Sequence, residues 1–245
     1  MTSTLSYDEM LAAIAERSAV LRSAVAGALA ARVPGCPEWT GRDLVAHLGE
    51  VQRSWAANVD AGPTDGPVED VKEAEPTGDL LDWSERSTET LLASLRSAGP
   101  DRGVWTWWGE PARSAAVARH QVQEALVHAW DAEDAAGRAG ALPAALALDG
   151  VDEFLATGMP ATGRWASAPG TVGVVATDGP GGGWRVVLAP DGSRLEPGDG
   201  TGDAVLRGSA SDLVLAFYRR RGLDSLDVTG SMELAGQFLG WFPTD

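Results

Sequence analysis

Hydrophobic residues recur at helical spacing over the first 140 residues of the chain. One helix is predicted at residues 7–31, a second begins after Thr40, and two more span residues 79–98 and about 112–137. Their apolar positions lie three or four residues apart, which places them on one face of an α-helix. Thr40 precedes Asp43 by three residues, as in a capping box. Four long helices joined by short connections or loops predict an antiparallel bundle.

Two segments rich in proline or glycine interrupt this helical pattern. ARVPGCPEW, at residues 31–39, is expected to end the first helix with its two prolines. AGPTDGPVEDVKEAEPTG, at residues 61–78, combines glycine, proline and acidic residues, so we expect a mobile loop between the second and third helices.

The pattern changes near residue 140. A helix is predicted near residues 143–156, followed by a loop at residues 157–170. TVGVVATD and GWRVVLAP predict two strands joined by a turn at GPGG. A strand, a helix, a short strand and a closing helix follow at AVLRG, SASDLVLAFYRRRG, SLDVTG and SMELAGQFLGWF. We therefore expect two domains of an α + β protein: a four-helix bundle at residues 1–140 and a small α+β domain at residues 141–245.

Composition and charge narrow the class of protein. The net charge of −16 repels phosphate backbones, so nucleic acid is not an expected partner. No apolar run approaches the roughly 20 residues that span a bilayer, so no membrane association is expected either. We expect a small-molecule ligand and a monomer or homodimer. The single cysteine, Cys36, and the lack of a signal peptide indicate a cytoplasmic protein, and we interpret Cys36 as a buried thiol rather than a nucleophile.

Two of the three histidines lie in ARHQVQEALVHAWDAEDAAG, at residues 118–137. A four-residue step along a helix rotates by about 40° and rises by about 6 Å, so Glu124 and His128 project from neighbouring points of one face. Such a pair can hold a metal ion from two sides, and His120 with Glu124 makes an equivalent pair. The two histidines lie roughly 12 Å apart along the axis, which is too far for both to bind one ion.

A solvated helix face is the alternative interpretation of this segment. Apolar residues cluster on the other side of the same helix: Val122, Ala125, Leu126, Ala129 and Trp130. His120, Glu124, His128 and Asp131 would then form the polar side that faces water. Asp131, three residues after His128, either orients a metal ligand or is an exposed helix acid.

His47 is the candidate for a third ligand. It lies on the second predicted helix, at the edge of the apolar stripe between Leu44 and Val51, and therefore near the interior of the bundle. Facing helices of bundles commonly build metal sites there, although an isolated core histidine is the alternative. With Glu124 and His128 it would give two nitrogens and one carboxylate, the donor set of open catalytic zinc sites.

Two stretches, VPGCPEWTGRDLVAHLGEV and RHQVQEALVHAWDAEDA, resemble the mycothiol-dependent maleylpyruvate isomerase family. The likeness spans nearly the whole chain and implies an N-terminal DinB-like four-helix bundle. GSASDLVLAFYRRRGLDSLDVTGS is similar to the family's C-terminal α+β domain, which has a sterol-carrier-like fold. The resemblance implies that His47, Glu124 and His128 form a metal triad, with zinc as the expected ion.

The resemblance also implies a catalytic arginine and a thiol cofactor. The family's arginine at the end of the C-terminal helix best matches Arg220, the middle one of three consecutive arginines. Many relatives have a histidine immediately before the ligand glutamate, whereas this chain has Gln123 there and His120 three residues earlier. This departure leaves the triad intact and concerns the contacts around it. The implied cofactor is mycothiol, whose thiol a bound cation would activate.

The expected function is therefore that of a divalent-metal-dependent enzyme that activates mycothiol either to isomerise small electrophilic substrates or to transfer the thiol onto them (S-transfer). A non-catalytic protein that binds or sequesters a small molecule on the same fold is one alternative. A metal-dependent hydrolase, in which the open position activates water, is another. The aromatic residues of VWTWWG, Trp105, Trp107 and Trp108, are interpreted as packing between the two domains rather than as the mouth of a pocket.

Overall fold

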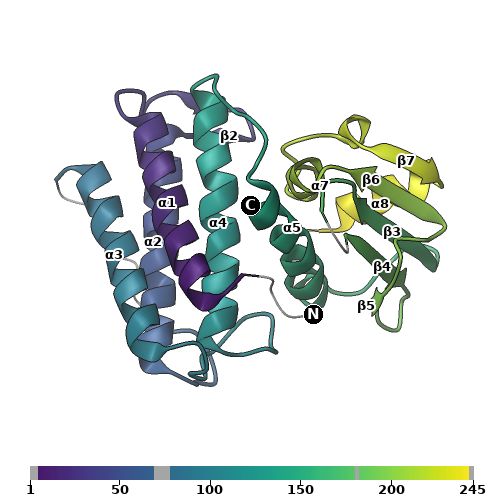
Figure 1. Ribbon diagram of the computed structural model, residues 1–245, viewed down its shortest axis with the longest axis horizontal. Coiled ribbons are helices and arrows are strands. Elements are labelled where there is room, and N and C mark those ends of the chain that lie inside the picture. Colours follow the sequence, from purple (N-terminus) through teal and green to yellow (C-terminus); the bar gives the residue numbers. More distant parts are fainter. Residues whose placement is uncertain (1–4, 69–77, 180–181, 243–245) are drawn as a thin grey trace. The chain divides into compact units, whose positions relative to one another are not determined.

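The computed structural model describes residues 5–68, 78–179 and 182–242. The chain divides into two compact units, of which one comprises Leu5–Gly140 and the other begins at Ala141 (Figure 1). The loop expected at residues 61–78 lies mostly outside the described residues, and so does the middle of the turn expected at GPGG.

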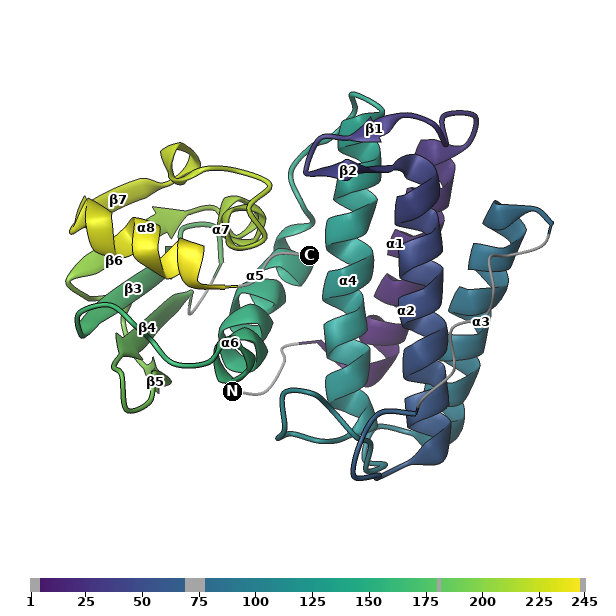
Figure 2. The ribbon, with the colours of Figure 1, turned by 180° about the vertical axis from the view of Figure 1, so that it is seen from behind.

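Four long helices form the first unit, and the predicted four-helix bundle is confirmed (Figures 1 and 2). Their bounds are α1 Tyr7–Val25, α2 Gly41–Ala61, α3 Leu80–Ala98 and α4 Ser114–Ala135. Apolar residues from these helices and from the segment between α1 and α2 fill the interior, among them Leu21, Val25, Val33, Leu44, Leu48 and Leu80. The bundle is thus held by burial of the apolar stripes that the sequence shows.

The prediction that neighbouring helices run antiparallel is wrong for α2 and α3. Gly49 packs against the ring of Trp83, and further along both helices Thr88 donates a hydrogen bond to Gln52 at 2.8 Å. The contacts advance in the same direction on both helices, so α2 and α3 are parallel. The physical reason is the connection at residues 62–79, which at about 3.3 Å per residue is long enough to return along the whole length of α2.

Helix α2 begins at a capping box, as predicted from Thr40 and Asp43. The Asp43 carboxylate accepts the backbone N–H of Thr40 at 2.8 Å, and the Thr40 hydroxyl accepts the backbone N–H of Asp43 at 3.4 Å. These bonds satisfy donors that the first turn of a helix leaves open. The cap therefore fixes where α2 starts, and with it the position of His47 two turns later.

Helix α1 ends at Val25, earlier than the predicted residue 31. Gly27 has a φ of 80°, a left-handed conformation that few other residues adopt readily, and the chain leaves the helix there. A hairpin follows instead of a simple break, with β1 at Arg32–Val33 and β2 at Cys36–Thr40. Cys36 is buried in the hairpin, as expected from the sequence.

The second unit contains a five-stranded sheet and is α+β, as predicted. Its strands are β3 Gly170–Ala176, β4 Gly183–Leu188, β5 Arg194–Pro197, β6 Ala204–Gly208 and β7 Asp227–Gly230. The strand order is β5-β4-β3-β6-β7, with β3 and β6 parallel and the other neighbours antiparallel. The sequence did not predict β5, which is short and contains a charged residue at each second position.

The helices of this unit are α5 Ala144–Glu153, α6 Met159–Thr162, α7 Ala210–Phe217 and α8 Met232–Trp241. A π-helical turn at Phe154–Gly158 joins α5 to α6, so the chain stays helical into the segment expected to be a loop at residues 157–170. On β4 the buried side chains alternate, from Trp184 to Val186 and Leu188, as in a strand with one covered face.

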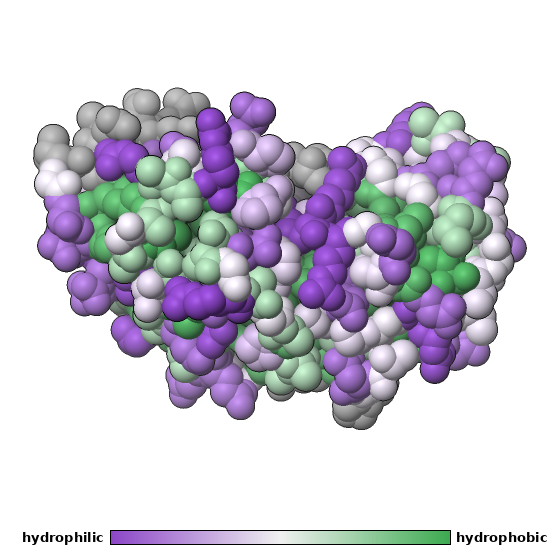
Figure 3. Space-filling view, turned by 90° about the horizontal axis from the view of Figure 1, so that it is seen from above, coloured by the Kyte–Doolittle hydropathy of each residue, from purple (hydrophilic) through white to green (hydrophobic). Residues whose placement is uncertain are grey.

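Figure 3 shows hydrophilic residues spread over the face seen from above, with hydrophobic residues between them. Among the described residues, no helix combines the length and the hydropathy that crossing a bilayer demands.

Replacement of Gly49 by alanine should destabilise the bundle. A Cβ atom at this position would lie 2.2 Å from Cζ3 of the Trp83 ring, which is itself buried. Overpacking of this kind costs about 1–3 kcal/mol, more than the gain of up to about 1 kcal/mol that alanine brings to a helix. Chemical denaturation should therefore show a lower free energy of unfolding. Gly240→Ala in α8 is the matched control, because no described atom lies within 4 Å of its added Cβ, and it should show no loss.

Candidate metal centre

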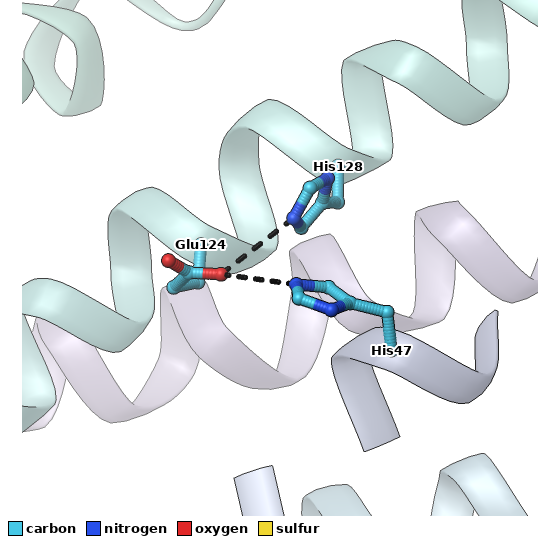
Figure 4. Close-up of side chains that lie close together, drawn as sticks. All are labelled: His47, Glu124 and His128. Carbon is cyan, nitrogen blue, oxygen red and sulfur yellow. Dashed lines mark ion pairs between the residues drawn. The ribbon is translucent and has the colours of Figure 1, made fainter. Parts of the chain in front are cut away.

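The structure brings together the three side chains that the sequence analysis combined into a triad. His47 projects from α2, and Glu124 and His128 project from consecutive turns of α4. One nitrogen or oxygen atom from each lies within 4.8 Å of the other two. Figure 4 shows one carboxylate oxygen of Glu124 directed toward both imidazole rings, while the other oxygen points away.

The distances between these atoms fit an ion better than direct hydrogen bonds. Glu124 Oε2 lies 3.6 Å from His128 Nε2 and 4.0 Å from His47 Nε2, beyond the usual hydrogen-bond range. Two ligands of a tetrahedral zinc ion, each bound at 2.0–2.2 Å, are separated by about 3.4 Å. The Glu124 oxygen is also buried and accepts no hydrogen bond within the described part of the chain. Two imidazoles and one such carboxylate are therefore a fitting donor set for a divalent cation.

The alternative interpretation of a solvated face on α4 is wrong. His120 and His128 are 8% and 5% exposed, and Asp131 is completely buried. The apolar residues on the opposite side of α4 are buried as well, including Val122, Leu126 and Ala129. A helix covered on both sides can place its polar stripe inside the protein, where the stripe has to find partners of its own.

His120 and Asp131 contact the triad without belonging to it. His120 Nε2 lies 3.6 Å from Glu124 Oε1, the oxygen that points away from the other two imidazoles. Asp131 Oδ2 lies at hydrogen-bond distance, 3.1 Å, from His128 Nδ1. This arrangement agrees with the expectation that His120 and His128 cannot bind the same ion, because His120 lies next to Oε1 of Glu124 and His128 lies next to Oε2.

Aromatic rings surround both ends of this cluster. The Trp39 ring lies 4.7 Å from the His47 ring and 6.0 Å from the His128 ring, measured between centroids. Sequence reasoning missed Trp39 because it interpreted the segment that contains CPEWT only as the end of a helix. Its position on β2 places the indole beside the candidate ligands.

The VWTWWG segment gathers around His120, within the helical unit. Ring centroids of Trp107 and Trp108 lie 5.5 and 5.1 Å from that of His120, and Trp55 of α2 lies at 6.0 Å. Trp108 is buried, whereas Trp107 is 45% exposed. Trp105 stacks on Trp55 at 6.3 Å. These tryptophans therefore pack against the neighbourhood of the candidate metal centre.

Burial and neighbouring charges shift the pKa values of Glu124 and His128, the two candidate ligands on α4, in opposite directions. Burial alone raises the pKa of the Glu124 carboxyl group, but the surrounding imidazoles of His128, His120 and His47 outweigh it and lower the pKa to about 2. Burial alone lowers the pKa of His128, but the carboxylates of Asp131 and Glu124 outweigh it and raise the pKa to about 9. The metal-free cluster therefore holds a proton on His128 at neutral pH, which a metal ion would have to displace.

Arg220, the predicted catalytic residue, lies in the second unit just after α7. Its Nη1 donates a hydrogen bond to the Tyr218 carbonyl at 2.8 Å. Arg219 donates to the carbonyls of Gly240 and Phe242, and Arg221 forms an ion pair with Asp212. The catalytic role of Arg220 stays a prediction.

The fold and the site together define a two-domain protein with a candidate metal centre in a four-helix bundle and a small α+β unit after it. Residues 11–133 match the model of the mycothiol maleylpyruvate isomerase N-terminal domain, and residues 145–237 match that of the MDMPI C-terminal domain of the same isomerase. The chain therefore belongs to the mycothiol maleylpyruvate isomerase family, as the sequence resemblance predicted.

Two solved structures share the fold. Both are crystal structures of the mycothiol-dependent maleylpyruvate isomerase, and one of them is of a histidine-to-alanine mutant. They are 17% and 16% identical to this chain, respectively for the unmutated and mutant forms, each with a TM-score of 0.64 over 94% of this chain and 96% of theirs. Comparison with curated proteins finds no match.

The stability of the metal-free protein should fall as the pH rises from about 6.5 to about 9. The pKa of His128 is raised from 6.5 to about 9 in the folded state, so its contribution is complete below pH 6.5 and is lost as the pH rises through 9. Melting temperatures measured by circular dichroism in the presence of a chelator would show this decline. His128→Gln removes the titrating group and should flatten the profile. Parallel profiles for the two proteins would contradict the assignment.

Proposed function

We propose that this protein is a divalent-metal-dependent enzyme that activates mycothiol for isomerisation of a small electrophile or for transfer of the thiol onto it (S-transfer). The observation that carries the proposal is that His47 Nε2 and His128 Nε2 both lie near Glu124 Oε2, in the bundle of a member of this family. We propose zinc as the ion because nitrogen and carboxylate donors in this number are typical of catalytic zinc sites. Membership of the family supports mycothiol as the thiol.

The three residues would hold the cation through one atom each, one donor fewer than the four that zinc usually takes. A bound cation of this kind supplies a Lewis acid that lowers the pKa of a thiol into the neutral range. The chain contributes a low-dielectric setting for that charge, because Glu124 and His128 are largely buried. The indole of Trp39 lies 4.7 Å from the His47 ring and 6.0 Å from the His128 ring and would reduce access of water from that side.

The proposed isomerisation needs no oxidant or reductant. Mycothiol, when bound, would supply a thiolate for reversible addition to an activated cis double bond, which permits rotation to the trans form with no net change of oxidation state. In transfer of the thiol the new C–S bond would be kept and the adjacent carbon would take up a proton. Arg220 is our candidate for binding a carboxylate of the substrate or of mycothiol.

Elemental analysis of protein purified without a histidine tag should find about one equivalent of zinc per chain, because the three residues form a single site. Loss of a residue that hydrogen-bonds to a metal ligand lowers metal affinity roughly 10- to 100-fold. Loss of a ligand itself should lower zinc affinity further, in each of the variants His47→Ala, Glu124→Ala and His128→Ala. His120→Ala is the matched control, because it removes an imidazole next to Glu124 that lies outside the triad, and it should retain one equivalent. Full retention of metal by the three triad variants would refute the site.

Turnover should require both the thiol and the metal. Consumption of maleylpyruvate and of a panel of small electrophiles can be followed with and without mycothiol, and with and without chelator. Activity is expected only when mycothiol is present and chelator is absent, and Arg220→Ala should reduce it for substrates that carry a carboxylate. Metal-dependent turnover without thiol would favour the hydrolase. Ligand binding without turnover would favour the binding or sequestration protein.

A further inference from the structure

Asp131 is a carboxylate with no solvent-exposed surface, and it lies one helical turn beyond His128 on α4. Its Oδ2 atom is 3.1 Å from His128 Nδ1. The opposite nitrogen of the same ring, Nε2, faces Glu124 Oε2 at 3.6 Å. The imidazole of His128 is thus contacted at both ring nitrogens, by Asp131 on one side and by the candidate metal centre on the other.

The chemistry of the two groups sets the direction of this hydrogen bond. An ionised carboxylate can only accept hydrogen bonds, so His128 Nδ1 must carry the proton and donate it. A neutral ring protonated at Nδ1 keeps its lone pair at Nε2. In His128 the Nε2 atom points toward the position shared with Glu124 Oε2 and His47 Nε2, so its lone pair would face that position once a metal ion has displaced the second proton. The contact also limits rotation of the ring about its χ2 bond, because rotation would break it.

From this geometry we infer that Asp131 is a positioning residue, which fixes the tautomer and the orientation of His128 so that Nε2 is the metal-binding atom. The inference rests on the proposed function, because it assumes that an ion binds at the triad. Asp131 lies outside the triad, so its loss should lower the affinity for the metal without removing a ligand. A carboxylate in this position also increases the electron density on the imidazole, which strengthens it as a donor.

A purely structural role for Asp131 makes a different prediction. Asp131→Ala leaves the buried Nδ1–H group of His128 without this acceptor, and an unpaired buried polar group is costly. The variant should therefore have a lower melting temperature whether the role of Asp131 is structural or positioning. Only a positioning role also lowers the affinity of the folded protein for the metal. The two roles are therefore separated by metal affinity measured on protein whose folding has been checked by circular dichroism.

The test compares zinc affinity in the wild type, Asp131→Asn and Asp131→Ala by competition with a chromophoric chelator. We expect Asp131→Ala to bind zinc about 10- to 100-fold more weakly. Asp131→Asn keeps an oxygen that can accept from Nδ1 but loses the charge, so its loss should be smaller, on the order of 10-fold. Glu133→Gln removes one charge from the same part of α4 and is the matched control, with unchanged affinity. If Asp131→Ala does not fold, the zinc affinity of Asp131→Asn relative to that of Glu133→Gln distinguishes the positioning role from the structural role.

Nitrogen-15 spectra of the histidine rings give a readout that stability alone does not move. The chain has three histidines, so substitution of His120 by glutamine identifies the His120 signals in the zinc-loaded protein, and substitution of His47 by glutamine identifies the His47 signals in the metal-free protein. In the zinc-loaded wild type we expect His128 to be protonated at Nδ1 and bound through Nε2, and in Asp131→Ala we expect that signature to be lost or mixed. Unchanged zinc affinity and an unchanged ring signature in Asp131→Ala would overturn the inference alone. Absence of zinc binding in the wild type would overturn the proposed function and the inference with it.

Discussion

The candidate metal centre depends on one largely buried carboxylate held among imidazoles. Glu124 has His47 and His128 on one oxygen and His120 on the other. A carboxylate removed from water is costly unless charge or hydrogen bonds compensate it, and these imidazoles together offset the cost of placing Glu124 inside the bundle. The helices supply that compensation through their register: α4 sets the spacing from His120 to His128, and the cap at Thr40 sets the height of His47 on α2.

Helical geometry predicts the part of the candidate site that lies on one helix, and it does not predict the part that depends on packing. The pairing of Glu124 with His128, and the separation of His120 from His128, follow from spacing along α4. The addition of His47 came from the position of that residue on its apolar stripe and from the family resemblance, because the register between α2 and α4 is set by side-chain packing that no periodicity records. The burial of Asp131 was missed for a related reason, since a polar stripe looks the same in sequence whether water or another part of the protein faces it.

The fold shows the same division between local and long-range determinants. Thr40 and Asp43 define the start of α2 in the sequence alone, and each of the four bundle helices was predicted close to its observed bounds except for the end of α1. The parallel course of α2 and α3 was not predicted, because it depends on a connection long enough to allow either direction. The prolines of ARVPGCPEW were recognised as ending a helix, but the hairpin they permit, and with it Trp39, needs pairing between β1 and β2 that a two-residue strand hardly encodes.

The junction of β2 and α2 has a mechanical consequence. Strand β2 ends at Thr40 and α2 begins at Gly41, so no flexible linker separates the indole of Trp39 from the first turn of the helix that carries His47. Thr40 is at once the last residue of the strand and the anchor of the capping box. Any displacement of Trp39 would therefore fall directly on the first turn of α2, because no intervening loop is present to absorb it.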